Sequence, residues 1–272
     1  MEDLVDRAVQ GDRDSLEKLI ERIQDRVYGL AIRMLAYPAD AEDATQEILV
    51  KIVTNLGSFQ RESSFTTWVY RIASNHLLTT RKRRAEGLAL TFNLCESLVD
   101  RGLEYSHFDK SHGAEQGLIV KEMMIECLHA LLLCLDRSLR ITFILSHVFG
   151  TNSVDGAYIL GITPAGFRKR LSRARSLVRD FMRKKCGLFD LENPCQCARQ
   201  ISFAEKRGAV NREKLLFASH PAGSAEDMPN FDRLQELGEL KRLAIIFRSC
   251  PDYIAPKGLV ESLKEALETR AF

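Results

Sequence analysis

The sequence lacks any run of about 18 consecutive apolar residues, the minimum for a helix that crosses a membrane. Its first residues, Met1-Glu2-Asp3-Leu4, are acidic and have none of the basic-then-apolar order of a secretory signal. The sequence also lacks a Gly-rich phosphate loop, paired catalytic carboxylates and a nucleophile–histidine constellation. We therefore expect a cytoplasmic protein that neither inserts into membranes nor acts as an enzyme.

A strong net charge is missing as well. The 39 Lys and Arg residues are balanced by 37 Asp and Glu residues, which leaves only +2. The charges are distributed unevenly, however: positive charge is concentrated in Arg81–Arg84 and between Arg168 and Lys185, whereas acidic residues crowd the N-terminal part. Such blocks predict separate surfaces with different partners.

Alternation of apolar and polar residues, the pattern of a strand, does not occur over any length before residue 186. Apolar residues recur at helical spacing instead, in three stretches joined by short connections: 1–35, 40–56 and 65–83. This pattern predicts a three-helix bundle, with Asp40 as the N-cap of its second helix. Residues 85–115 contain glycines and show no sustained period, which predicts a linker.

Helical patterns resume after the linker and predict helices over 118–135, 137–149, 153–160, 163–185, 200–219, 231–248 and at the C-terminus. The length of 272 residues suits two domains with an appendage. We therefore expect an all-α protein with four parts: 1–84, a linker at 85–117, 118–185, and a helical C-terminal extension at 186–272.

A helix–turn–helix unit is the most specific local pattern. The short helix near 153–160, a turn at Gly161 and a helix starting at Thr163-Pro164 have the spacing of a DNA-binding unit. The apolar face of the second helix carries Phe167, Leu171, Ala174 and Val178, and its other faces carry Arg168, Lys169, Ser172, Arg173 and Arg175. A basic run alone usually indicates a solvated face, but with the turn and cap in register it favours DNA binding.

A second constellation joins the acidic string Asp40–Glu47, then Phe59, and the aromatic and basic string Phe65–Asn75. An acidic helix face can meet a basic protein partner. Aromatic and arginine side chains can hold unstacked bases of a single strand. Taken singly, Phe65 and Trp68 fit better as core residues of the bundle.

At these residues the sequence resembles a known family. Asp40–Glu47 with Phe65–Asn75 resembles region 2 of the sigma-70 family of bacterial RNA polymerase subunits, and the stretch from Leu131 to Arg179 resembles region 4. Two such blocks with a linker and no region 3 between them resemble the extracytoplasmic-function (ECF) group. The resemblance covers roughly residues 5–185 and implies that the bundle is region 2 and the helix–turn–helix domain is region 4.

The resemblance also implies partners and site residues. It implies binding to core RNA polymerase through the β′ clamp helices and the β flap. In this chain it assigns contact with the clamp helices to Asp43, Gln46 and Glu47. It assigns −10 promoter recognition to Phe59, Phe65, Trp68, Arg71 and Asn75, and −35 recognition to Arg168, Lys169, Ser172 and Arg173. Arg81–Arg84 would lie along the promoter backbone, and an anti-sigma factor is a further partner of this kind of protein. One departure is Val154-Asp155-Gly156-Ala157-Tyr158, where the family commonly has a Glu-Ile-Ala core.

Seven cysteines in a cytoplasmic chain argue against a disulfide framework. Cys186, Cys195 and Cys197, with Cys250 as a fourth ligand, form a candidate site for zinc or another soft metal ion. A reversible disulfide between two of these thiols is the competing functional interpretation, and a turn with partly buried thiols is the structural one. Cys95, Cys127 and Cys134 lie in linker or apolar helical contexts and are interpreted as structural.

Two other functions fit parts of the sequence. A helix–turn–helix regulator that acts on duplex DNA without polymerase would leave the acidic Asp40–Glu47 face without a purpose. A thiol-dependent enzyme built on the C-terminal segment would need an activating base, and the sequence supplies none.

Overall fold

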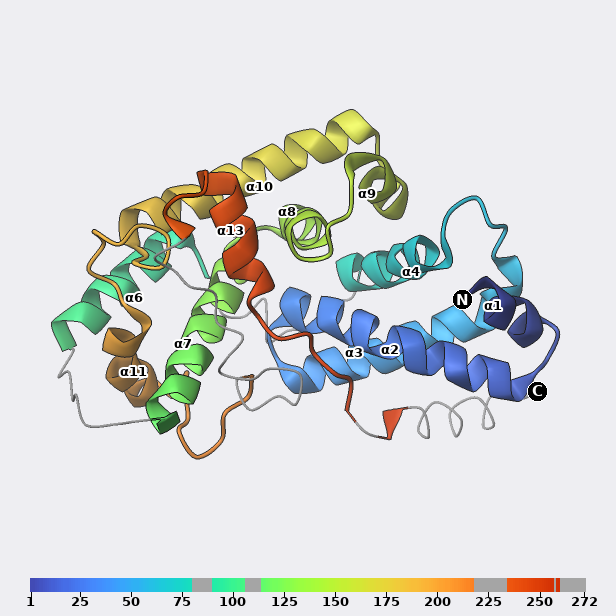
Figure 1. The fold of residues 1–272 in the computed structure, drawn as a ribbon, viewed down its shortest axis with the longest axis horizontal. Helices are drawn as coiled ribbons and strands as arrows, with labels where there is room; N and C mark the ends of the chain where they lie inside the picture. The colour runs from blue at the N-terminus through green and yellow to red at the C-terminus, as the bar shows by residue number, and fades with distance from the viewer. Residues whose placement is uncertain (80–89, 106–113, 218–233, 257, 260–272) are drawn as a thin grey trace. The chain divides into compact units, whose positions relative to one another are not determined.

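The computed structural model describes residues 1–79, 90–105, 114–217, 234–256 and 258–259, and it consists of helices joined by turns (Figure 1). Among these residues there is no β-strand, and an isolated bridge between Cys186 and Cys195 is the one strand-like pairing. The prediction of an all-α fold is confirmed. None of the described helices has the length and apolar character needed to cross a membrane.

The N-terminal part is the predicted bundle with one extra helix. Its elements are α1 (Glu2–Val9), α2 (Arg13–Leu35), α3 (Pro38–Thr54), the 3₁₀ turn η1 (Leu56–Ser58) and α4 (Phe65–Thr79). Helix α2 packs against α1, α3 and α4, and this packing buries Leu19, Ile20, Ile23 and the whole stretch from Val27 to Leu35. The expected single helix over 1–35 is interrupted at Gly11, which adopts φ 94°.

The start of α3 differs from the prediction. Asp40 was expected to be the N-cap, but α3 begins at Pro38 and Tyr37 occupies the cap position. Ala36 ends α2 in the left-handed conformation, with φ 63°, and its N–H donates to Ile32 O at 2.7 Å. Proline fits the first helical position because its fixed φ is helical and its missing N–H would have no partner there. Asp40 contributes its charge to the first turn instead.

The rest of the described chain is also helical. Its elements are α6 (Phe92–Tyr105), α7 (Ala114–Leu133), α8 (Arg137–Phe143), the π-helical turn η2 (Ile144–Val148), α9 (Ser153–Leu160), α10 (Pro164–Lys185), α11 (Cys197–Lys206) and α13 (Glu239–Arg248). The sequence predicts no helix between 85 and 115, whereas the structure has α6 there, packed against α7 and α11. Helix α11 is shorter than the predicted 200–219, and the predicted C-terminal helix lies outside the described residues.

The residues fall into two compact units that differ from the predicted domains. One unit combines 1–87 with 152–167 and 252–272, and the other combines 88–151 with 168–251. The boundaries at 84, 117 and 185 therefore stay predictions. The second unit draws together the predicted linker, most of the predicted region 4 and most of the extension.

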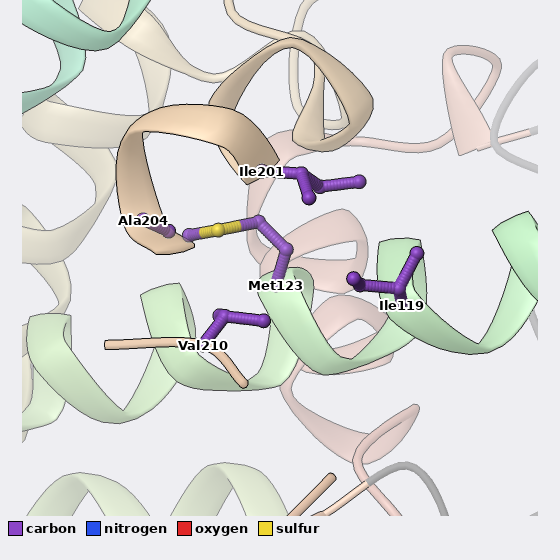
Figure 2. Close-up of a cluster of buried hydrophobic side chains, with 5 residues drawn as sticks. All are labelled: Ile119, Met123, Ile201, Ala204 and Val210. Carbon is purple, nitrogen blue, oxygen red and sulfur yellow. The ribbon is translucent and has the colours of Figure 1, made fainter. Parts of the chain in front are cut away.

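The extension is part of the hydrophobic core of this second unit. Figure 2 shows Ile119 and Met123 of α7 against Ile201 and Ala204 of α11, with Val210 from the turn that follows. All five are at most 8% exposed. The extension is also hydrogen-bonded to α7, because Glu122 accepts the backbone N–H groups of Leu216 at 2.7 Å and Phe217 at 2.9 Å.

Candidate nucleic-acid and partner interfaces

Helix α3 presents the predicted acidic face to solvent. Asp43 and Glu47 are exposed and Gln46 is half-buried, while Ala44 and Ile48 on the opposite side are fully buried. The three polar residues share a face because positions three and four apart are neighbours on a helix. The arrangement supplies a rigid, acidic, solvent-facing strip.

A buried histidine links this strip to α4. The Nε2 atom of His76 lies 3.5 Å from a carboxylate oxygen of Glu47, and its Nδ1 atom lies 2.8 Å from Lys51 Nζ. His76 is only 4% exposed, so the contacts fix α3 against α4 at their partly solvated junction.

Three aromatic rings cluster at the start of α4. Phe59 lies 5.4 Å from both Phe65 and Trp68, and Phe65 and Trp68 lie 5.6 Å apart, measured between ring centroids. Phe65 is 3% exposed, whereas Phe59 and Trp68 are half-buried. Phe65 therefore supports the two outer rings, and those two can reach a ligand.

Trp68 also borders an open polar groove of about 360 Å³ between the end of α3 and α4. The groove is lined by Lys51, Asn55, Ser58, Trp68, Ile72, Asn75, His76 and Thr79. Amide, hydroxyl and ammonium groups beside an aromatic ring suit an unstacked base, because the base offers both a flat face and polar edges. Asn75, the exposed member predicted from sequence, lies in this groove.

The loop before α4 is tied down at two places. Arg61, which adopts φ 59°, makes an ion pair with Asp6 of α1. On its other side, Tyr158 of α9 borders a small pocket with Phe59 and Trp68. The Arg71 guanidinium lies 4.6 Å from the centroid of the Tyr158 ring. Helix α9 thus covers part of the predicted −10 surface, a contact that no feature of the sequence predicted.

The helix–turn–helix forms as predicted. Asn152 caps α9 by accepting from Val154 and Asp155, and Gly161 makes the turn with φ 62°. Thr163 Oγ1 accepts the N–H of Gly166 at 3.0 Å, which confirms the capping hydroxyl before Pro164.

Gly156, the departure from the family pattern, has a steric reason. A Cβ atom at this position would lie 2.3 Å from the ring of Phe167. Phe167 is fully buried, so α9 and α10 approach too closely there for any side chain on residue 156.

The two faces of α10 separate as the sequence predicts. Phe167, Ala174 and Val178 are fully buried and Leu171 is 7% exposed. Arg168, Lys169, Ser172 and Arg173 are all exposed. Arg175 differs, because its Nε donates to His147 Nε2 at 2.7 Å. Burial, with the charges of Arg175 and Arg248, lowers the pKa of His147 to about 4, so the ring stays neutral and accepts that bond. Arg81–Arg84 lie outside the described residues.

The C-terminal cysteines gather at an apolar cavity of about 90 Å³ in the second unit. Cys186, Cys195 and Cys197 line it together with Cys95 and Cys127, two thiols interpreted as structural from the sequence. Cys250 is buried and is not among the described residues that line it. Gly187 lies against Cys195 and donates its N–H to that residue's carbonyl at 2.9 Å, which closes the turn.

Burial favours the protonated form of these thiols. Burial raises the pKa of Cys186 to about 12 and raises the pKa of Cys195 and Cys197 as well. Within the described ranges, no three Cys, His, Asp or Glu side chains lie close enough together to hold a metal ion. Metal binding at Cys186, Cys195, Cys197 and Cys250 therefore stays a prediction, and it would require the thiols to move and lose protons.

Comparison with known proteins matches part of the N-terminal bundle to a known family. Residues 19–86 match the family Sigma-70 region 2. The chain is 28% identical over 179 residues to RNA polymerase sigma-H factor of Pseudomonas aeruginosa, covering 64% of this chain and 90% of that protein. It is 29% identical over 178 residues to ECF RNA polymerase sigma-E factor of Haemophilus influenzae, covering 64% and 91%. ECF RNA polymerase sigma factor SigW of Bacillus subtilis is 25% identical over 175 residues, covering 64% and 92%.

Proposed function

Because the chain belongs to the sigma-70 family, in its ECF group, we propose that it binds core RNA polymerase in the cytoplasm and directs it to specific promoters. It does no covalent chemistry in this role. The observation that carries the proposal is the exposed acidic strip of α3 beside a groove of aromatic and polar side chains, within the residues that match region 2. A regulator that binds only duplex DNA, without polymerase, would need neither the acidic strip nor the groove.

The acidic strip is the proposed contact with the β′ clamp helices. Asp43 and Glu47 are exposed, and the buried face behind them fixes α3 in the bundle. A rigid strip loses little conformational entropy on binding, and its charge steers a basic partner into place. Gln46 lies between the two carboxylates and supplies a hydrogen-bonding group.

The groove between α3 and α4 is the proposed site for an unstacked base of the −10 element. Trp68 offers a ring face in the groove, and Asn75 offers hydrogen bonds. Phe59, which packs on Trp68, and Arg71, which lies over the Tyr158 ring, are outside the groove lining and are the proposed contacts to neighbouring parts of the strand. Stacking of a base on an aromatic ring contributes about 1–3 kcal/mol, and only unpaired DNA can use it. Opening of the duplex is therefore driven by tighter binding to the separated strand. Phe65 acts by supporting the other two rings.

Helix α10 is the proposed reader of the −35 element. Its N-terminal turn is capped, and the turns that follow carry Arg168, Lys169, Ser172 and Arg173 on the solvent side. Arginine and lysine pair with guanine edges or phosphates in the major groove, and the helix N-terminus favours a phosphate. Contact with the β flap and with an anti-sigma factor is proposed from the family alone.

The extension is the proposed regulatory part. Tyr253 lies under the guanidinium of Arg33, 4.7 Å from ring centroid to Cζ, and the N–H of Ala255 donates to Asp25 at 2.8 Å. The segment 253–255 thus contacts α2 of the bundle that contains the proposed polymerase-binding strip. A change at the cysteines of the extension would be transmitted to this bundle if it moved that segment.

Run-off transcription with purified core polymerase and genomic promoter fragments tests the proposal. Asp43→Lys should weaken binding to core about tenfold or more, which corresponds to at least about 1.4 kcal/mol. Glu21→Lys, an exposed residue of α2, is the matched charge reversal and should leave binding unchanged. Arg173→Ala should reduce transcription from −35-dependent promoters while core binding stays intact.

Transcripts that require the full chain, and that Asp43→Lys abolishes, would establish the sigma function. Binding to duplex fragments without binding to core would instead identify a conventional helix–turn–helix regulator. Turnover of a substrate that disappears in Cys195→Ser would favour the thiol-dependent enzyme.

A further inference from the structure

Cys95 and Cys134 are far apart in the sequence but in contact in the second unit. Cys95 lies in α6 and Cys134 lies in the turn after α7, and their Sγ atoms are 3.4 Å apart. A disulfide bond is about 2.05 Å long, so each sulfur would move by less than about 1 Å to form one. The sequence pattern alone indicates a structural role for both residues.

The backbone around Cys134 is held rigidly. The guanidinium of Arg140 donates to the carbonyls of Leu132, Leu133 and Leu135 at 2.9–3.2 Å, which clamps the turn on both sides of the cysteine. Arg140 itself is 8% exposed. These hydrogen bonds hold the backbone on both sides of Cys134, which favours the position of its thiol beside Cys95.

Helix α6 is fixed against its surroundings in the same way. Lys185 of α10 makes an ion pair with Asp100 at 2.6 Å, and Gln200 of α11 donates to Val99 O at 3.1 Å. Cys95 therefore faces Cys134 from a second rigid element. The pair joins a helix that packs on the extension to the turn that begins α8.

The two thiols are not equivalent. The hydrogen bond between them lowers the pKa of Cys95 and raises the pKa of Cys134, and the nearby Arg207 further favours the Cys95 thiolate. Burial instead raises the pKa of the other thiols at the cavity: Cys127, Cys186, Cys195 and Cys197. Cys95 is thus the best nucleophile among the five cavity thiols.

An oxidant can reach the pair from two sides. Cys95 lines the cavity of about 90 Å³, and one water molecule needs roughly 10–15 Å³ of such space. Cys134 is partly exposed at the surface. A molecule as small as hydrogen peroxide therefore fits beside Cys95.

From this geometry we infer that Cys95 and Cys134 are a reversible redox pair, which hydroperoxides convert into a disulfide. The Cys95 thiolate attacks one peroxide oxygen, the O–O bond breaks, and the leaving hydroxide takes a proton to become water. Cys134 then attacks the resulting sulfenic sulfur, forms the S–S bond and releases the second oxygen as water. The two thiols lose two electrons and two protons, and a dithiol reductant reverses the change.

Peptide mapping of the full-length protein tests this inference. The reduced protein is treated with equimolar hydrogen peroxide, remaining thiols are alkylated, and the protein is digested with trypsin. Cleavage after Arg84 and Arg101 isolates Cys95, but cleavage after Lys121 and Arg137 leaves Cys127 and Cys134 on one peptide. The experiment therefore also uses Cys127→Ser as a matched variant and Cys134→Ser as the variant that removes the pair.

The expected product joins peptides 85–101 and 122–137 in the wild type and in Cys127→Ser, and it disappears in Cys134→Ser and on reduction. In Cys134→Ser, Cys95 should be trapped as a sulfenic acid by dimedone. The wild type oxidised in urea gives the baseline, in which the pair is one of 21 pairings that seven thiols allow. Three outcomes would overturn the inference. The link could persist in Cys134→Ser, or the folded protein could pair its thiols no more selectively than the unfolded one. Cys186, Cys195 or Cys197 could also form the preferred link.

Discussion

Two carboxyl groups one turn apart on α7 should respond in opposite ways to replacement by glutamine. Glu126 is partly buried, and this burial, with the neighbouring Glu122 charge, raises its pKa from 4.5 to about 7 against the opposing effect of Arg207. Glu122 is 3% exposed and accepts the two backbone N–H groups of Leu216 and Phe217. We predict that Glu126→Gln stabilises the protein at alkaline pH and that Glu122→Gln destabilises it.

The sign for Glu126 follows from the direction of its shift. A raised pKa means that the folded state binds the proton more tightly than the unfolded state does. Stability is therefore complete below the unfolded pKa of 4.5 and falls as the pH rises towards 7. Each pKa unit corresponds to about 1.4 kcal/mol, so the loss is about 2–3 kcal/mol after allowance for partial exposure. Glutamine has no charge to bury, so Glu126→Gln should recover this amount at pH 8 and little near pH 5.

Urea denaturation of both variants at the two pH values measures these differences. Glu122→Gln should lose about 2–3 kcal/mol at pH 8, because its two hydrogen bonds to a charged acceptor become bonds to a neutral amide. An effect of Glu126→Gln that is the same at pH 5 and pH 8 would show that this carboxyl does not titrate between them, and the reasoning would fail.

Three further substitutions test other contacts. Gly156→Ala should cost about 1–3 kcal/mol in thermal denaturation because its Cβ would overlap Phe167, whereas Gly117→Ala, with open space in α7, should gain up to about 1 kcal/mol. Lys169→Ala should reduce the slope of log affinity against log salt for −35 duplex DNA by about 1, and an unchanged slope would remove Lys169 from the interface. Tyr158→Ser should strengthen binding of a −10 single strand roughly two- to five-fold, the equivalent of the 0.5–1 kcal/mol of one partly exposed cation–π contact with Arg71. Unchanged binding would show that α9 does not compete for this surface.

The helix–turn–helix could be predicted closely because its determinants are local. The bounds of α9, the Thr163 cap and the buried face of α10 all follow from spacing and capping within about 30 residues. The acidic strip of α3 was predictable for the same reason. The first residue of helix α3 was not, because the helix begins at Pro38 and not after an N-cap at Asp40.

Helix α6 could not be predicted because its stability comes from distant partners. Its glycine at 102 favoured a linker, yet a Cβ there would overlap Gln200 of α11, so the glycine permits close packing of the two helices. The composition of the thiol cavity was hidden for the same reason. Cys127 is far from Cys186 in sequence and reaches it only through packing, whereas Cys250 is buried outside the set of residues that line this cavity.

The same packing changes how the extension should be studied. Removal of the chain after residue 185 would uncover Ile119 and Met123 and would leave Glu122 without its two N–H donors. Burial of one such side chain contributes about 1.5–3 kcal/mol, so the two apolar residues alone would lose about 3–6 kcal/mol, a large share of the stability of a typical domain. Loss of activity on truncation would then report unfolding as much as lost regulation. Point substitutions that keep α11 on α7, such as those at Cys134 and Tyr158, separate the two effects because they leave this core intact.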